Sequence, residues 1–287
     1  MTFSIVARSA DGTCWGVAVA SKFLAAGAVV PAARAGVGAL ASQSFLNLRY
    51  LPDGLALLAE GVGAQEVVDR LTGPDDLRDS RQLGVVDAAG GSASWTGAEC
   101  IAWAGSAGGP DHTAQGNCLA GPEVVERMSQ AFVASGDATP LARRLLAALA
   151  AGDDAGGDRR GRQSAGLLVV TEGGGYAGGN DVLVDLRSDD HPAPVGELAR
   201  LLDLHDLYFG RPDPADLAPL DGPLAEEVDR LLRALGHDRD ELPLDDRLFD
   251  WMGWENYEER HVPGSIDAVV LRELRAAATA AADEPLA

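Results

Sequence analysis

Lysine is almost absent from this chain. Lysine and arginine together number 23 in 287 residues, and Lys22 is the only lysine. An ammonium group has a pKa that its surroundings can shift, whereas a guanidinium stays charged. A single lysine kept in such a composition indicates a role that arginine cannot fill. The alternative is that one surface lysine has been kept by chance.

Basic residues are few altogether. Aspartate and glutamate number 44 against 23 basic residues, which gives a formal net charge of -21. Binding of nucleic acid or of an anionic membrane needs a basic face. The charge therefore argues against both as partners. It says little about the substrate, for which we expect a small molecule. A homo-oligomer stays open.

Cysteine and long apolar runs are also scarce. The three cysteines, Cys14, Cys100 and Cys118, have no metal-ligand spacing, so we expect no metal and no cofactor. No apolar run reaches the roughly 18 residues of a membrane span, and no signal-peptide pattern opens the sequence. We therefore expect a cytoplasmic protein with reduced cysteines. A nucleophilic Cys14 would have no base partner that the sequence identifies.

The opening stretch contains the clearest structural signal. Two apolar runs flank Asp11 and Gly12, a residue pair typical of a two-residue hairpin turn. Counting outward from that turn pairs Thr2 with Ser21. The sequence therefore predicts an antiparallel hairpin that brings the chain start close to Lys22.

Thr2 is a candidate nucleophile. Methionine aminopeptidases remove Met1 when the next residue is small, and the mature chain would then begin with Thr2 and a free α-amine. A threonine hydroxyl is an established nucleophile when an adjacent N-terminal amine acts as its base. An α-amine titrates at about pH 8. The hairpin count places Lys22 opposite Met1, where its charge would lower the pKa of that amine. The alternative is that Thr2 is an ordinary first-strand residue.

Groups of strands and groups of helices follow one another over the rest of the first 209 residues. Apolar runs separated by glycine predict strands over 28–33, 37–44, 82–87, 93–96, 112–116, 164–171 and 181–186. Apolar residues at helical spacing predict helices over 46–60, 64–71, 123–134, 140–151 and 194–209. The first four strands are expected to form one sheet. This segregation favours an α+β fold with sheets layered against helices over a doubly wound parallel sheet.

A second, smaller domain is expected at the C-terminal end. Residues 210–223 are rich in proline and aspartate, which is typical of a linker. Helical patterns recur within 224–287. We therefore expect one domain over 1–209, a linker over 210–223 and a small α-rich domain over 224–287.

Two further patterns have structural interpretations. The glycine cluster at 173–179 lies between two predicted strands, and no helix follows it, so a turn is favoured over a phosphate site. Asp189, Asp190 and His191 could bind a metal ion, but helix capping before Pro192 is the favoured interpretation.

Several motifs together resemble a known family. The opening hairpin, the glycine-punctuated third and fourth strands and the segments 158–164 and 179–181 are similar to the bacterial family catalogued as domain of unknown function 1028, over about residues 1–209. That family resembles the N-terminal nucleophile hydrolases, which implies a four-layer αββα sandwich. From about Leu220 the chain resembles a domain described as peptidoglycan-binding.

The resemblance implies hydrolysis of an amide or related C–N bond with Thr2 as the nucleophile. The chain departs from proteasome-like relatives at two positions. Their carboxylate at the end of the second strand is Ser21 here, and their basic residue at the third strand is Arg34. Lys22 would replace this support if its side chain turned toward Thr2.

The chemistry of amide hydrolysis adds further candidates. A tetrahedral oxyanion needs donors near the nucleophile, and we expect them from the backbone at Ala41 and Ser42 and from the side chain of Asn117. Alternatively, Asn117 is a turn residue after a strand. A bidentate clamp for an acidic or acylamino substrate is offered by three neighbours, Asp158, Arg159 and Arg160. The alternative for these three is a solvated loop.

Two function classes result. The first is an N-terminal threonine amidohydrolase that acts on a small, acidic metabolite. The second is a catalytically silent scaffold of the same fold whose C-terminal domain binds a glycan or a protein partner. The missing carboxylate at Ser21 and the appended domain motivate the second.

Overall fold

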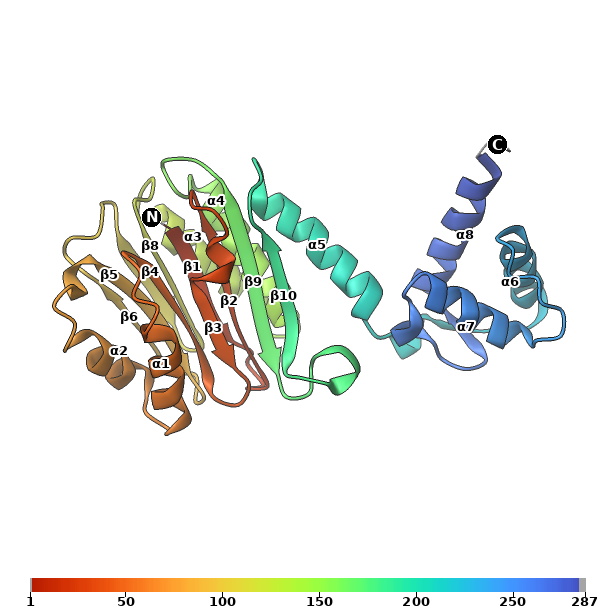
Figure 1. Ribbon diagram of the computed structural model, residues 1–287, viewed down its shortest axis with the longest axis horizontal. Helices are drawn as coiled ribbons and strands as arrows, with labels where there is room; N and C mark the ends of the chain where they lie inside the picture. The colour runs from red at the N-terminus through yellow and green to blue at the C-terminus, as the bar shows by residue number, and fades with distance from the viewer. Residues whose placement is uncertain (1, 284–287) are drawn as a thin grey trace. The chain divides into compact units, whose positions relative to one another are not determined.

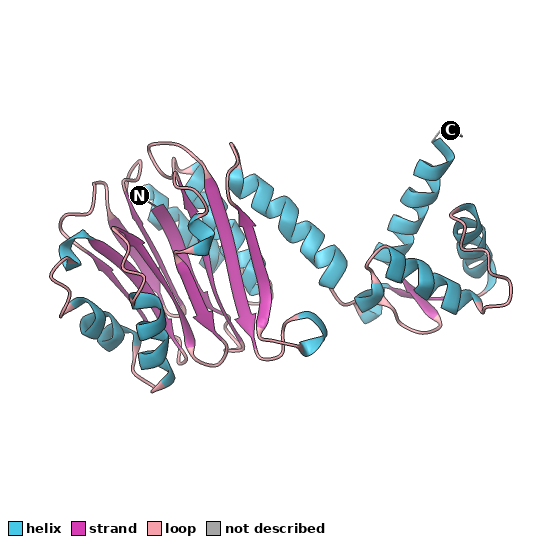
Figure 2. Cartoon of the chain, viewed as in Figure 1, coloured by secondary structure: helices cyan, strands magenta, loops and turns pink. Residues whose placement is uncertain are grey.

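The computed structural model describes residues 2–283 of the chain. It divides into two compact units, with the boundary between Leu201 and Leu202. Figure 2 shows that the long strands belong to the first unit and that the second unit is mostly helical. Over the described range, no helix is long and apolar enough to cross a membrane.

The larger sheet of the first unit has the strand order β10-β9-β2-β1-β8-β7 and is antiparallel throughout. Its strands are, in chain order, β1 (Thr2–Arg8), β2 (Cys14–Ser21), β7 (Gly105–Gly109), β8 (His112–Asn117), β9 (Ser164–Thr171) and β10 (Val182–Ser188). The opening hairpin therefore lies in the middle of this sheet, where both of its outer edges are hydrogen-bonded.

The smaller sheet has the order β3-β4-β5-β6, also antiparallel. Its strands are β3 (Pro31–Arg34), β4 (Gly38–Ser44), β5 (Arg81–Asp87) and β6 (Ser92–Thr96). Valine and alanine side chains from the two sheets pack on each other, among them Val17 and Val19 of β2 and Ala39 and Ala41 of β4. The two sheets thus lie face to face.

Helices cover the outer face of each sheet. α1 (Tyr50–Ala59) and α2 (Ala64–Thr72) pack on the smaller sheet through a second apolar core. α3 (Glu123–Ala134) and α4 (Leu141–Asp154) pack on the larger sheet (Figure 1). The first unit is therefore an α+β arrangement of helices, two antiparallel sheets, and helices.

The opening hairpin has the predicted register. Thr2 is the cross-strand partner of Ser21, and Gly12 in the turn has a φ of 72°, which favours glycine. The expectation that the first four strands share one sheet is wrong. β1 and β2 pair on their other sides with β8 and β9, and the chain after β2 crosses to the second sheet before β3 begins.

The second unit begins within α5 (Pro194–Phe209) and includes its second half. It continues with α6 (Gly222–Ala234), α7 (Leu244–Trp254) and α8 (Ala268–Asp283). Its core contains Val228, Leu248, Trp251 and Leu274. Part of the expected linker is ordered structure, because β11 (Leu217–Pro219) pairs with β12 (Ser265–Asp267). The C-terminal region is helical, as its sequence pattern predicts.

Candidate functional site

Thr2 begins β1 at one end of the larger sheet and is buried, with 5% exposure. Its cross-strand partners are Ser21 on β2 and Asn117 on β8, and its Oγ1 lies 3.0 Å from Ser21 Oγ. Successive strand residues alternate between faces. Because Phe3 lies against Gly152 of α4, Thr2 faces the smaller sheet. The candidate nucleophile therefore lies between the two sheets.

Three carboxamide side chains fill the space between the sheets beside Thr2. Gln43 Nε2, on β4, donates to the carbonyl oxygen of Thr2 at 3.3 Å and to Gln82 Oε1 at 2.8 Å. The same oxygen of Gln82, on β5, accepts from Asn117 Nδ2 at 2.9 Å. All three side chains are fully buried. The sheets are thus joined by amide hydrogen bonds at the Thr2 end.

The backbone fixes the orientation of these amides. Gln82 Nε2 donates to the carbonyl oxygen of Gly116 at 2.8 Å and to Thr96 Oγ1 at 2.9 Å. A carbonyl oxygen only accepts, so Gln82 presents its nitrogen to Gly116 and its oxygen to Asn117. Asn117 must then present Nδ2 to Gln82. Its Oδ1 is buried and has no hydrogen-bond partner among residues 2–283.

The network extends one row deeper into the sheets. Ser4 Oγ donates to Gln43 Oε1 at 2.7 Å and accepts from Gln115 Nε2 at 2.7 Å. Gly84 leaves room for this row, because a Cβ there would overlap the carboxamide of Gln115. Sequence reasoning missed Gln43, Gln82 and Gln115. For Gln43 and Gln82 the available signal was a glutamine whose neighbours two residues away are small or apolar. Gln115 lies between polar neighbours at that spacing and gives no such signal.

The side chain of Lys22 contacts the segment before β9 and not Thr2. Its side chain is exposed, and its Nζ donates to the carbonyl oxygen of Arg162 at 3.4 Å. Its backbone N–H donates to Asp158 Oδ2 at 3.0 Å. Because β2 ends one residue earlier, strand alternation does not direct this side chain. The predicted pairing of Lys22 with Met1 lies outside the described residues.

Arg34 and Ser42 also point away from the nucleophile. Arg34 ends β3 and is exposed. Ser42 is buried, but alternation with Gln43 places it on the helix-covered face, where its Oγ donates to the carbonyl oxygen of Asn47 at 3.3 Å. Its backbone N–H donates to the carbonyl oxygen of Val30 at 3.1 Å. That N–H is therefore already engaged and does not provide the expected oxyanion donor.

The residues expected to bind a substrate carboxylate are bonded to other protein groups instead. Asp158 is buried and accepts from Arg160 twice, at 2.7 Å from Nη2 and at 3.1 Å from Nε. Arg159 Nε donates to Cys118 Sγ at 3.1 Å. Together with the Lys22 backbone, these contacts fasten the loop after α4 to the ends of β2 and β8. The Arg160 guanidinium is therefore engaged with Asp158, which holds the loop in place.

Large apolar side chains are exposed on loops at the Thr2 end of the sheets. These loops follow β2, follow β4 or precede β7, and their backbone is joined to the strand ends. Five such side chains are 48% exposed or more, namely Phe23, Leu24, Phe45, Leu48 and Ile101. These exposed apolar side chains therefore lie on loops at the same end of the sheets as Thr2.

A second buried polar cluster lies at the start of α1. Asp75 accepts from Tyr50 OH at 2.7 Å, from Arg81 Nε at 3.0 Å and from Asn47 Nδ2 at 3.1 Å. Burial alone would raise the pKa of Asp75, but the hydrogen bonds, led by that from Tyr50, hold this pKa well below its usual value. Burial and the bond to Asp75 raise the pKa of Tyr50 well above its usual value.

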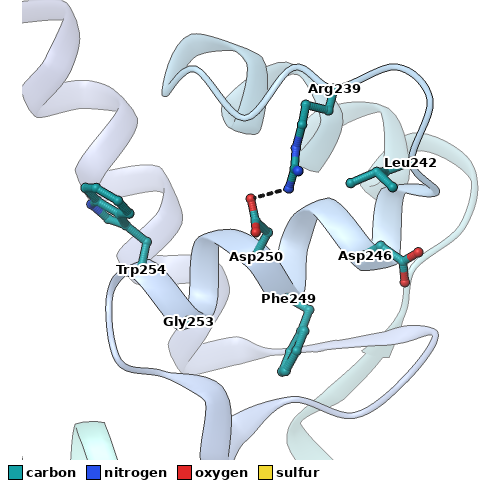
Figure 3. Close-up of a pocket in the computed structure, with 7 residues that line it drawn as sticks. All are labelled: Arg239, Leu242, Asp246, Phe249, Asp250, Gly253 and Trp254. Carbon is teal, nitrogen blue, oxygen red and sulfur yellow. Dashed lines mark hydrogen bonds and ion pairs between the residues drawn. The ribbon is translucent and has the colours of Figure 1, made fainter.

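Two pockets are open at the surface of the separate units. The Asp75 cluster borders one of about 590 Å³, whose rim includes Arg49 and Arg70. The other, of about 470 Å³, lies along α7 (Figure 3). In it Arg239 Nη2 donates to Asp250 Oδ2 at 2.8 Å, and Trp254 is 78% exposed.

The predicted metal alternative concerned the residues before α5. Among the described residues, no group of three or more His, Cys, Asp or Glu side chains is placed to hold a metal ion. His191 Nδ1 accepts from the backbone N–H of Ala193 at 3.0 Å, directly before α5 begins. His191 thus caps the approach to that helix.

Comparison with known proteins identifies relatives of this chain. No curated protein sequence matches it. Among solved structures, it is similar to the crystal structure of protein SPO2555 from Silicibacter pomeroyi, a DUF1028 protein, with 31% identity and a TM-score of 0.64. The match covers 79% of this chain and 92% of that one. The model of the family of unknown function DUF1028 matches residues 2–198, so the chain belongs to DUF1028.

Proposed function

We propose that the first unit hydrolyses an amide or related C–N bond of a small molecule, with Thr2 as its N-terminal nucleophile once Met1 has been removed. The observation that carries this proposal is the buried Thr2 hydroxyl, 3.0 Å from Ser21 Oγ at the first position of a central strand. The order of helices, two facing sheets and helices agrees with the sandwich of N-terminal nucleophile hydrolases. We include that fold assignment in the proposal.

The nucleophile and the base of the proposed chemistry are both groups of Thr2, at the start of β1. Thr2 Oγ1 attacks the substrate carbonyl, and the α-amine of Thr2 takes the hydroxyl proton and later gives it to the leaving amine. The resulting ester is then hydrolysed by water. Burial lowers the pKa of an amine because it disfavours the charged form. Burial can therefore lower the pKa of the Thr2 α-amine without the nearby positive charge expected from Lys22.

Asn117 remains the proposed side-chain donor to the oxyanion. Its Nδ2 carries two protons, and Gln82 accepts only one of them. The other proton is available to an oxygen that develops negative charge next to Thr2, which is the cross-strand partner of Asn117.

The surroundings of Thr2 favour an apolar substrate group over the acidic one expected from the sequence. Arg160 is paired with Asp158, so a substrate carboxylate would have to break that pair. The loops at this end instead expose Phe23, Phe45 and Ile101. Apolar surface of this kind gains free energy when a ligand covers it. We therefore propose an amide whose acyl or amine portion is apolar.

The first test is the N-terminus of the purified protein. Intact-mass measurement and fragmentation of the N-terminal peptide should give a chain that begins with Thr2. A free threonine amine is the base that the proposed mechanism needs. A chain that retains Met1 would block that amine and contradict the proposed function.

A second candidate function concerns the second unit, which we propose binds a glycan. The pocket along α7 combines an exposed tryptophan with an arginine and carboxylate pair, and flat aromatic faces with polar rims suit sugar rings (Figure 3).

In co-sedimentation of the full chain with insoluble peptidoglycan, Trp254→Ala should reduce the bound fraction several-fold, and Trp254→Phe should reduce it less. Wild-type protein that stays in the supernatant would exclude this candidate.

A further inference from the structure

The buried carboxamide oxygen of Asn117 has no protein partner to explain its position. The residue is 0% exposed, and Oδ1 makes no hydrogen bond with any described residue. Buried polar atoms in folded proteins are almost always hydrogen-bonded, because losing water without a replacement costs stability. A buried oxygen without a hydrogen bond therefore indicates a donor other than the side chains that surround it.

Rotating the Asn117 carboxamide by 180° would not give Oδ1 a hydrogen-bond donor. If Asn117 were rotated to present Oδ1 to Gln82, two amide oxygens would face each other. Gln82 cannot rotate in response, because its nitrogen is held by the carbonyl oxygen of Gly116. Gln43 adds to the constraint, since its nitrogen donates to Gln82 and to the carbonyl oxygen of Thr2. Three groups therefore hold Oδ1 on the side of Asn117 away from Gln82.

Thr2 is the nearest neighbour across the strand on that face of the sheet. It pairs with Asn117 in the β1–β8 register, and such partners place their Cβ atoms about 4.5–5.5 Å apart. Asn117 Oδ1 lies two bonds beyond Cβ, on the strand that pairs with Thr2. The main-chain nitrogen of Thr2, as a peptide amide, makes no hydrogen bond to this oxygen, but removal of Met1 would give that nitrogen further protons to donate. That nitrogen is the α-amine in a chain that begins with Thr2.

We propose that Asn117 Oδ1 accepts a hydrogen bond from the α-amine of Thr2 in the processed protein, and that Gln82 is the positioning residue that aims this oxygen. The inference rests on the proposed function, because it requires a processed N-terminus. It assigns both ends of one carboxamide: the oxygen holds the base, and the spare Nδ2 proton faces the developing oxyanion. A single asparagine thereby contacts both the base and the developing oxyanion.

The test is the pKa of the α-amine, measured without any substrate. A hydrogen bond to the ammonium form favours that form. Asn117→Ala should therefore lower the α-amine pKa by about one unit, and Asn117→Asp should raise it by about one unit or more through its negative charge. Gln82→Met removes the acceptor for Nδ2 and should lower the pKa by a smaller amount.

The chain offers a clean background for this measurement. Lys22 is the only lysine, so a Lys22→Arg protein has the α-amine as its only primary amine. Acetylation of the folded protein by trace acetic anhydride is followed from pH 5 to pH 10, roughly the range around an ordinary α-amine pKa. The acetylated N-terminal peptide is quantified by mass spectrometry. Thermal unfolding of each variant confirms that the folded state is the one titrated.

Opposite shifts for Asn117→Ala and Asn117→Asp would support the inference, because a loss of packing alone would move both in the same direction. Unchanged values, or shifts of one sign in both variants, would overturn it and leave the proposed function standing. Retention of Met1 would overturn both together. The two failures are therefore distinguishable.

Discussion

Replacing Thr2 with alanine is expected to reduce turnover of an amide substrate at least about a thousandfold, because it removes the proposed nucleophile and leaves only binding and oxyanion stabilisation. The substrate for this measurement comes from screening the processed wild-type protein against small amides with apolar acyl or amine groups. Turnover is followed by release of the amine.

Thr2→Ser is the matched control for this prediction. Serine keeps both the hydroxyl and the α-amine, and it is small enough to allow removal of Met1. It should therefore retain measurable turnover where alanine does not. Ser21→Ala should have an intermediate effect, since it removes the hydroxyl 3.0 Å from Thr2 Oγ1 and leaves the nucleophile in place. Equal turnover in wild type and Thr2→Ala would assign the chemistry to another residue.

Replacing Asp75 with asparagine is expected to lower the free energy of unfolding of the first unit by about 3 kcal/mol. Arg81 would lose its charged partner while staying 8% exposed, and an unpaired buried charge is costly. Breaking a buried ion pair usually costs about 3–5 kcal/mol, and we expect the lower value because the Asp75 side chain is 13% exposed. Hydrogen exchange of peptides from α1 and β5 during urea unfolding would report the first unit alone.

An exposed ion pair at the start of α1 provides a matched control. Asp53 pairs with Arg49 at 3.0 Å, but both side chains are exposed, at 44% and 79%. Exposed pairs contribute little because water and salt screen them, so Asp53→Asn should cost no more than about 0.5 kcal/mol. Similar losses for the two variants would show that burial of the Asp75 cluster is not what makes it stabilising.

The same cluster gives a pH dependence with a definite sign. The native pKa of Asp75 is held below its ordinary value, whereas the unfolded chain has a pKa of about 3.9. Between these two values the unfolded state binds more protons than the native state. The stabilisation from Asp75 is therefore complete above about pH 4 and decreases as the pH falls further. Asp75→Asn should show a smaller loss of stability over that acid range.

Local patterns predicted the hairpin and the register that pairs Thr2 with Ser21. The turn at Asp11 and Gly12 fixes the register by itself, so the pairing of Thr2 with Ser21 could be counted from the sequence. The distribution of strands between two sheets could not be predicted in the same way. The partners of β1 and β2 are β8 and β9, and nothing in the first 44 residues specifies strands that come so much later.

Two errors at the site have a shared physical origin. Lys22 follows the last residue of β2, so the alternation that directs Ser21 inward does not extend to it. Ser42 lies within β4, and alternation directs its neighbour Gln43 toward Thr2 instead. Which face of β4 meets the other sheet depends on tertiary packing. A polar residue in a strand therefore does not reveal its side from the sequence alone.

The central position of β1 also determines when the N-terminus becomes buried during synthesis. Thr2 becomes buried only when β8 pairs with it, and Asn117 is made long after Thr2. At about 5–20 residues per second, that interval lasts roughly 6–23 s. A peptidase that trims the residue in front of Thr2 has this window while the strand is still unpaired. After the sheet closes, Thr2 itself leaves its buried position only by local unfolding, so the proposed N-terminal trimming and the folding of β1 compete in time.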